Sequence, residues 1–309
     1  MRSPTRAIVR ALVYLTWTAL LIPVQAGALA LRLPLRKRLP RFYHATCCRI
    51  LGIEVQARGA PSADHPVLFV ANHASYLDIT VLGSLIPGSF VSKAEVADWP
   101  FFGLLAKLQR TVFIDRRSAK AASHRDEVGW RLAAGDDLIL FPEGTSSDGN
   151  RVLPFKSALF SVADPRGRQR PLVVQPVSVA YTHIDGLPLG REWRPHVAWY
   201  GDMEIGDHIF NLIALGRLRV EVTFHPPLDH SAIEADLARA GGATPSGLRK
   251  ALAERSHVLV AQGHGAALFA RGRPAGNGDA PSGRDGAARQ SPSAPRTPPQ
   301  AGDGAPVLP

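Results

Sequence analysis

Residues 11–31 (ALVYLTWTALLIPVQAGALAL) form an uncharged run of 21 residues near the N-terminus. As a helix, this run is long enough to cross about 30 Å of hydrocarbon. A secretory signal peptide is the rival interpretation, but the run is long, no clear small-x-small cleavage site precedes a polar mature start, and basic residues follow at once. A buried core helix is the other alternative, while Pro23 and Gln25 leave a shallow or re-entrant anchor open. We therefore expect residues 1–41 to be a membrane anchor.

Basic residues flank this run on both sides, and the heavier cluster follows it. They are Arg2, Arg6 and Arg10 before the run and Arg32, Arg36, Lys37, Arg38 and Arg41 after it. Because the positive-inside rule keeps the more basic flank in the cytoplasm, we expect the main body on the cytoplasmic side of the inner membrane.

Charge and cysteine content limit the function classes. The formal net charge of +10 indicates an anionic partner, and nucleic acid, acidic lipid headgroups and phosphorylated substrates all qualify. Much of the surplus lies in the first 41 residues and near the C-terminus, without interleaved aromatic residues, which disfavours nucleic acid. The two cysteines, Cys47 and Cys48, are adjacent, so they predict neither a disulfide framework nor a thiol-bound metal.

Residues 42–270 alternate between short β-like runs and helical stretches, which predicts an α/β fold with a mixed central sheet flanked by helices. The expected strands are 67–70, 111–114, 138–141, 172–180, 196–200 and 218–224, and the expected helices are 101–109, 124–134 and 155–163. Gly263 and Gly265 are interpreted as the stop of a later helix. Residues 271–309 are mostly Gly, Pro, Ala, Ser and Arg, which predicts a disordered tail.

The first chemical motif is NHASYLD at 72–78, directly after an expected strand. Among the 11 histidines, only His73 has an aspartate, Asp78, five positions on, and the two can meet across a strand-to-helix turn. An imidazole that removes a hydroxyl proton in the transition state contributes about 10²–10⁴-fold to rate, and a carboxylate on its other nitrogen fixes the tautomer. An N-capping aspartate with an incidental histidine is the alternative. We also count Asn72 as a candidate substrate-binding residue.

The second motif is TVFIDRR at 111–117, where a strand delivers Arg116 and Arg117 at its end. Ligand-binding groups in α/β sheets usually lie at such strand ends. A guanidinium fits the oxygens of a phosphate monoester in a bidentate fashion. A solvated basic turn is the alternative interpretation.

The third motif is FPEGTSS at 141–147, again after an apolar strand. Glu143 is a candidate acceptor for a substrate hydroxyl or for a neighbouring arginine. Gly144 permits close backbone approach, and Thr145 offers a hydroxyl and a main-chain donor. Lys156 follows soon after and adds a positive charge. An ordinary polar turn is the alternative.

Together these motifs resemble the glycerolipid acyltransferases, typified by 1-acylglycerol-3-phosphate acyltransferase. NHASYLD at 72–78 is similar to the first block of that family, VFIDRR at 112–117 to the second and FPEGTSS at 141–147 to the third. VQPV at 174–177 is similar to a weaker fourth block. The resemblance covers about residues 65–180.

The resemblance implies a fatty acyl transfer to the free hydroxyl of a lysolipid, which for lysophosphatidate would give phosphatidate. It implies acyl-CoA or acyl-carrier protein as donor, with no metal and no other cofactor. It also implies roles for particular residues: His73 as general base, Asp78 as its partner, Arg116 as the phosphate-binding residue, and Glu143, Gly144 and Thr145 as the residues that shape the acceptor site.

One departure from the family pattern bears on the acceptor. The third block of the family often reads FPEGTR, and here Ser146 stands in place of that arginine. The loss of a cation favours an acceptor other than a dianionic phosphate. Residues 175–181 and 199–203 are similar to a bacterial branch that includes lyso-ornithine lipid acyltransferases, which is the second acceptor interpretation.

Other function classes have weaker support. A serine hydrolase would need a GxSxG elbow, which the sequence lacks. The sequence also has no P-loop and no HExxH motif. A basic membrane-binding or nucleic-acid-binding protein without catalysis remains the alternative from a different class.

Overall fold

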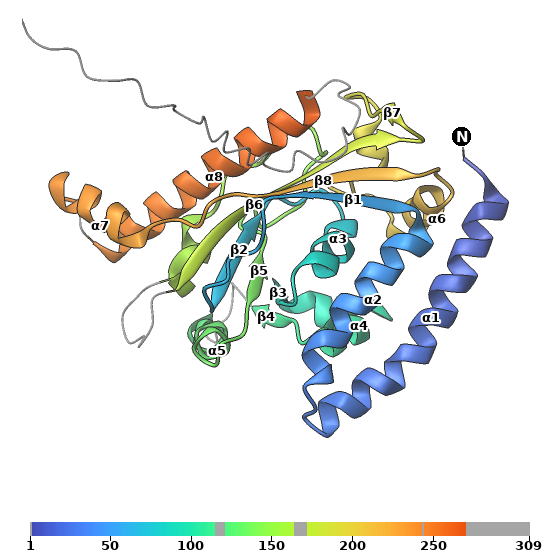
Figure 1. The fold of residues 1–309 in the computed structure, drawn as a ribbon, viewed down its shortest axis with the longest axis horizontal. Helices are drawn as coiled ribbons and strands as arrows, with labels where there is room; N and C mark the ends of the chain where they lie inside the picture. Colours follow the sequence, from blue (N-terminus) through green and yellow to red (C-terminus); the bar gives the residue numbers. More distant parts are fainter. Residues whose placement is uncertain (1, 115–120, 164–171, 243, 270–309) are drawn as a thin grey trace, which may run out of the picture. The chain divides into compact units, whose positions relative to one another are not determined.

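The structure is a computed structural model that describes residues 2–114, 121–163, 172–242 and 244–269 (Figure 1). The chain divides into two compact units, residues 1–272 and 273–309, and the second lies outside the described residues. The expected disordered tail over 271–309 therefore stays a prediction.

The strands of the first unit form one mixed sheet in the order β1-β8-β6-β2-β5-β3-β4, with β7 paired to β6. The strands are β1 (Ile53–Arg58), β2 (Val67–Ala71), β3 (Ser89–Lys93), β4 (Val112–Ile114), β5 (Leu138–Leu140), β6 (Val173–Ile184), β7 (Leu187–Pro188) and β8 (Leu218–Phe224). Five neighbouring pairs are parallel, and β6 pairs antiparallel with β7 and β8. The prediction of an α/β fold with a mixed central sheet is confirmed.

Helices cover both faces of this sheet. They are α1 (Pro4–Ala30), α2 (Leu35–Leu51), α3 (Leu77–Leu85), α4 (Phe102–Leu108), α5 (Ala121–Ala133), α6 (Ile205–Ile213), α7 (His230–Arg239) and α8 (Pro245–Phe269), with 3-10 helices η1 (Ala94–Asp98), η2 (Ser157–Ala163) and η3 (Arg194–His196). Figure 1 shows α8 on one side of the sheet and α2, α3 and α4 on the other.

The hydrophobic core lies on both faces of the central strand β2, whose five residues are all buried. Because side chains alternate along a strand, Phe69 faces the layer that contains Leu82 of α3. Leu68 faces the opposite layer, which contains Leu252 of α8. A strand that is buried on both faces reads as a continuous apolar run, which is how the sequence identified it.

The N-terminal helix α1 starts seven residues earlier than the uncharged run, because Ser3 caps it and Pro4 occupies its first position. By length and composition α1 can cross a membrane, and only 11% of its most apolar window is buried. Its two ends nevertheless contact the same body. Near the start, Arg10 donates to the Leu215 carbonyl at 2.7 Å, and near the end Gln25 donates to the Leu108 carbonyl at 2.8 Å.

Two sequence-based expectations are wrong. The strand expected at 196–200 is absent: η3 ends at His196, and the backbone then turns, with Ala198 N donating to Arg194 O at 3.0 Å. The helix stop expected at Gly263 is also absent, because α8 continues to Phe269. A side chain at Gly263 would collide with Ser178 and His225, so this glycine serves the close approach of α8 to the sheet.

Candidate active site

Two loops meet at the carboxyl edge of the parallel pair β2 and β5. One is residues 72–78, which we call the catalytic turn, and the other is residues 141–150. Backbone hydrogen bonds join them, since Ser147 N donates to the His73 carbonyl at 2.9 Å. His73 N in turn donates to Glu143 Oε1 at 3.0 Å. The first and third sequence motifs therefore form one site, as expected from their positions after parallel strands.

His73 and Asp78 are in direct contact within the catalytic turn. His73 Nδ1 lies 2.9 Å from Asp78 Oδ2, and the Asp78 side chain is completely buried in the first turn of α3. The same oxygen accepts the backbone N–H groups of Ala74 at 2.7 Å and Ser75 at 2.9 Å. Tyr181 donates its hydroxyl to the other oxygen, Oδ1, at 2.5 Å. These donors hold the carboxylate in one orientation.

This arrangement determines which nitrogen of His73 can act as a base. Because Asp78 accepts hydrogen bonds from backbone N–H groups, it is an acceptor for His73 as well, and the proton lies on Nδ1. Nε2 then carries the lone pair. The ring stacks on Phe141 with centroids 4.2 Å apart and planes inclined by 17°, and the side chain is 22% exposed. The geometry is that of a preoriented general base that substrate can reach.

Glu143 is almost completely buried beside this pair. Burial raises the pKa of Glu143 to about 8; the hydrogen bond from the His73 backbone opposes this shift, and the nearby Asp78 charge adds to it. At neutral pH the carboxyl is therefore mainly protonated. It accepts a hydrogen bond from His73 N and so holds the catalytic turn against the loop at 141–150.

Asn72 differs from its expected role in substrate binding. The residue is buried, its side-chain N–H donates to the Val179 carbonyl at 2.9 Å, and its oxygen accepts Val179 N at 2.8 Å. These bonds tie the end of β2 to β6, so Asn72 positions the catalytic turn instead of facing a ligand.

The other predicted residues lie at the surface or outside the described ranges. Gly144 adopts φ +74°, a conformation that favours glycine and makes the sharp turn after Glu143. Thr145 and Lys156 are exposed, and Lys156 N donates to the Pro142 carbonyl at 2.9 Å. Arg116 lies outside the residues that the structure describes, so its role as phosphate-binding residue stays a prediction.

Two residues of the site were missed by sequence reasoning. Tyr181 reaches Asp78 from β6, more than 100 positions along the chain, and no local pattern identifies such a contact. Phe141 was quoted as part of a motif but was not expected to stack on the base. Its position directly after a strand that is parallel to β2 was the available signal.

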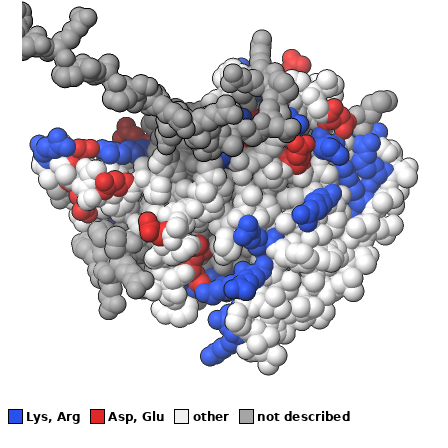
Figure 2. Space-filling model, in the orientation of Figure 1, with Lys and Arg blue, Asp and Glu red and all other residues white. Residues whose placement is uncertain are grey.

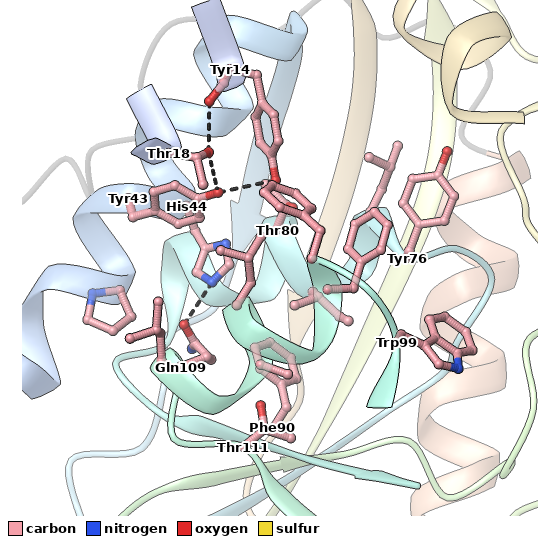
Figure 3. A pocket seen from close by; sticks show the side chains of 18 of the residues that line it. Tyr14, Thr18, Tyr43, His44, Tyr76, Thr80, Phe90, Trp99, Gln109 and Thr111 are labelled. Atoms are coloured by element: carbon pink, nitrogen blue, oxygen red, sulfur yellow. Dashed lines mark hydrogen bonds between the residues drawn. The ribbon is translucent and has the colours of Figure 1, made fainter. Parts of the chain in front are cut away.

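A cavity of about 430 Å³ opens beside the catalytic turn (Figure 3). Its walls come from α1, α2, α3, α4, α6 and β3 and are mostly apolar, with Leu15, Leu77, Phe90 and Ile209 among them. Figure 3 shows hydrogen-bonded Tyr14, Thr18 and Tyr43 gathered at one end and Tyr76 and Trp99 at another. Tyr76 and Leu77 belong to the catalytic turn itself, so the cavity reaches the neighbourhood of His73.

Within the described ranges, no group of three or more His, Cys, Asp and Glu side chains could hold a metal ion. The chemistry that this site supports directly is proton removal from a hydroxyl at Nε2 of His73, next to space for an aliphatic chain. That combination is the one found in enzymes that transfer acyl groups to lipid alcohols.

The comparisons with known proteins agree with this class. The acyltransferase family profile matches residues 52–180. The chain is 44% identical to a lyso-ornithine lipid O-acyltransferase of Brucella abortus over 67% of this chain and 79% of that one. It is 41% identical to the Rhizobium meliloti protein of the same name, over 76% and 82%. It is also 33% identical to a 1-acyl-sn-glycerol-3-phosphate acyltransferase of Neisseria gonorrhoeae, over 56% and 64%.

The fold is also found in a solved structure. The 1-acyl-sn-glycerophosphate acyltransferase PlsC of Thermotoga maritima superposes with a TM-score of 0.58 over 87% of this chain and 99% of that one, at 22% sequence identity. The protein is an acyltransferase of the lysophospholipid type. More narrowly, it belongs to the acyltransferase family that includes the lyso-ornithine lipid and 1-acylglycerol-3-phosphate enzymes.

Proposed function

We propose that this protein transfers a fatty acyl group from a thioester donor to the hydroxyl of lyso-ornithine lipid. The observation that carries the proposal is the preoriented His73–Asp78 pair, whose turn contributes Tyr76 and Leu77 to the lining of an apolar cavity. Two features favour this acceptor over lysophosphatidate: Ser146 in place of an arginine, and relatives above 40% identity that bear the lyso-ornithine name. The ornithine headgroup is zwitterionic and needs fewer cations than a phosphate monoester.

In the proposed mechanism, His73 Nε2 removes the proton from the acceptor hydroxyl as its oxygen attacks the thioester carbonyl. A new C–O ester bond forms and the C–S bond breaks. The imidazolium then returns its proton to the departing thiolate, so the products are the acylated lipid and a free thiol. Asp78 stabilises the imidazolium while it exists, because it already accepts the Nδ1 proton.

The apolar cavity is the proposed place of an acyl chain. Its lining from α1, α2 and α6 is mostly apolar, and burial of an aliphatic chain against such a surface is favourable by about 25 cal/mol per Å². The cavity opens next to Tyr76 and Leu77, which would bring the reacting end of the chain towards His73.

The contacts of α1 favour a membrane association in which this helix lies within one leaflet. A helix that crosses the bilayer has its ends on opposite sides, yet both Arg10 and Gln25 bond to the one catalytic body. Figure 2 shows a broad uncharged surface at α1, with Lys and Arg on neighbouring parts of the molecule. This pattern fits an interfacial anchor with its basic residues at the headgroups. The cytoplasmic side remains our assignment from the basic flanks.

Lysophosphatidate is the second candidate acceptor, because the relatives at 33% identity bear that name and because Arg116 is available as a phosphate-binding residue. The test is to incubate membranes that contain the protein with labelled acyl donor and each acceptor separately. We expect ornithine lipid to form faster than phosphatidate. Preferential labelling of phosphatidate would overturn the choice of acceptor, and no labelling of either beyond that seen with His73→Ala membranes would overturn the proposed function.

A further inference from the structure

A second hollow, of about 540 Å³, lies at the C-terminal end of the loop at 141–150, between Asn150 and the last turns of α8. We call it the arginine pocket. Its polar lining is Asn150, Arg151, Arg191, Arg194 and His264, and the last turns of α8 supply an apolar wall that ends at Phe269. None of the three arginines belongs to a motif that the proposed function uses.

The arginine pocket has a surplus of positive charge. In the described part of the chain, Arg151, Arg191 and Arg194 form no ion pair within 4 Å. The adjacent Asp148 is bonded to Asn150, whose N–H groups it accepts at 3.0 and 3.2 Å. Even when Asp148 is counted, two positive charges remain. Such a surplus around a hollow favours a ligand with two or more negative charges.

One nitrogen of the Arg194 guanidinium is hydrogen-bonded and another has no partner among the described residues. Its Nη1 donates to Asn150 Oδ1 at 2.8 Å, which fixes the guanidinium. Its Nε is buried and has no partner among the described residues. A fixed guanidinium with spare donors is preorganised to bind a phosphate.

The pocket wall is directly attached to the catalytic turn. A side-chain carbon placed on Gly149 would lie 3.7 Å from Arg194 Cβ and 3.8 Å from Ala74 Cβ. The segment after Arg194 also bonds to the turn, since Trp199 N donates to the Ala74 carbonyl at 2.8 Å. Ala74 follows His73, so a ligand in the pocket lies close to the reacting centre.

The position of the arginine pocket indicates which of the two substrates, the lipid acceptor or the acyl donor, it serves. Its apolar wall is the end of α8, which covers the face of the sheet opposite to α2, α3 and α4 (Figure 1). The apolar cavity of about 430 Å³ and the uncharged surface of α1 belong to the other face of the sheet. A lipid acceptor comes from the membrane side, whereas a water-soluble donor has access to the α8 side.

We propose that the arginine pocket binds the phosphate groups of the acyl donor, with the pantetheine arm extending from the pocket to His73. Phosphopantetheine is common to coenzyme A and to carrier proteins, so the same chemistry serves both donors. Arg151 and Arg191 are exposed and supply the entering phosphate with charge, and Arg194 completes the site. This inference rests on the proposed acyl transfer, because it assigns the donor side of that reaction.

The test is steady-state kinetics of the full-length protein with Arg151→Ala, Arg191→Ala and the double variant. Each is measured with acyl-CoA, with acyl-carrier protein and with acyl-pantetheine, which lacks phosphate. Since each variant removes a charged hydrogen bond to phosphate, we expect KM for a phosphate-bearing donor to rise by about 10-fold per arginine. We expect kcat and KM for the lysolipid to change little. Lys250→Ala is the matched control, since it removes a positive charge from the exposed other end of α8.

The outcomes are distinct. A raised KM for acyl-CoA, for acyl-carrier protein or for both, with acyl-pantetheine unaffected, supports the pocket and identifies the donor. Equal loss with acyl-pantetheine, or a raised KM for the lysolipid in place of the donor, overturns it. Unchanged kinetics with every donor also overturns it while leaving the proposed function intact. If the wild-type protein transfers no acyl group, it is the proposed function that has failed.

Discussion

The catalytic turn and the arginine pocket both contact the loop at 141–150, yet their charged groups differ in how fully they are hydrogen-bonded. Asp78 is completely buried, and every one of its contacts is a hydrogen-bond donor. In the described part of the chain, the arginines of the pocket form no ion pair, and Arg194 Nε has no hydrogen-bond partner. A side chain that must keep one orientation through a reaction has its hydrogen-bond partners supplied by the protein. A side chain that must bind a ligand keeps donors free for that ligand.

The largest loss of activity in this comparison is expected when Asp78 loses its negative charge. In Asp78→Asn the amide oxygen must still accept the Ala74 and Ser75 N–H groups, so it takes the place of Oδ2 opposite His73 Nδ1. The negative charge that stabilises the imidazolium is then lost, and the amide nitrogen replaces the oxygen that accepts from Tyr181. We expect kcat to fall by about 10²–10⁴-fold. The measurement is kcat on purified protein, with thermal unfolding as the control for folding. A variant that keeps more than a tenth of the activity would remove Asp78 from the mechanism.

Glu143 extends the comparison to stability, because it is buried beside the turn and forms no ion pair with a described residue. Its folded pKa of about 8 is higher than its ordinary value of 4.5. The folded protein thus keeps a proton that the unfolded chain releases, and the stabilisation present below pH 4.5 is lost as pH rises through 8. We expect the unfolding free energy to fall by as much as about 1.4 kcal/mol per pH unit in this window through Glu143 alone.

Denaturant unfolding of wild type and Glu143→Gln between pH 5 and 8 measures this contribution. The variant should show the shallower pH dependence, since glutamine cannot titrate. Glu234→Gln, on the exposed face of α7, is the control and should match the wild type. Parallel curves for wild type and Glu143→Gln would mean that Glu143 is ionised in the folded protein.

Tyr181 sharpens the question of how many donors Asp78 needs. Tyr181→Phe removes the hydrogen bond to Oδ1 and leaves those to Oδ2. The loss of one such bond contributes roughly 1 kcal/mol, so we expect kcat to decrease by about 5-fold with KM unchanged. A steady-state assay over pH 5–9 checks this and should show a displaced pH profile. If kcat and the pH profile are unaltered, the Tyr181 hydroxyl does not influence Asp78 and the side chain serves only in packing.

The smallest effect is expected beyond α8, whose end lines the arginine pocket. We predict that deletion of residues 272–309 changes activity by less than about two-fold, because their composition cannot form a packed core. The assay is acyl transfer by the truncated protein with each donor. A large loss, above all one confined to KM for the donor, would show that the tail takes part in donor binding.

Local pattern predicted the parts of the fold that local physics determines. The buried strand β2 and the alternating strand β8 were found at nearly their observed bounds, because an apolar run and a period of two are direct signatures of burial. The strand expected at 196–200 was wrong because its backbone N–H groups bond to the carbonyls of Arg194 and Ala74 and not to a strand of the sheet. Strands β1 and β3 were missed, since their polar residues hide the pattern and their pairing is set by distant strands.

The same limit applies to the site. His73 and Asp78 are five residues apart, so spacing was sufficient to predict their contact. Tyr181, Arg191 and Arg194 reach the site through the sheet and through the segment that ends at Trp199, and no local rule relates them to His73. Asn72 was predicted to bind substrate, and only the structure shows that its side-chain amide is bonded to the backbone of Val179.

The central claim is that His73 Nε2 takes the proton of the lipid hydroxyl. The most direct measurement compares wild type with His73→Ala for kcat on labelled donor and lysolipid, together with the binding of the lysolipid and the thermal midpoint. We predict that kcat falls by at least about 10²-fold while binding and midpoint are nearly unchanged, because the base acts chiefly in the transition state. A folded His73→Ala protein that turns over within ten-fold of the wild-type rate would contradict the account.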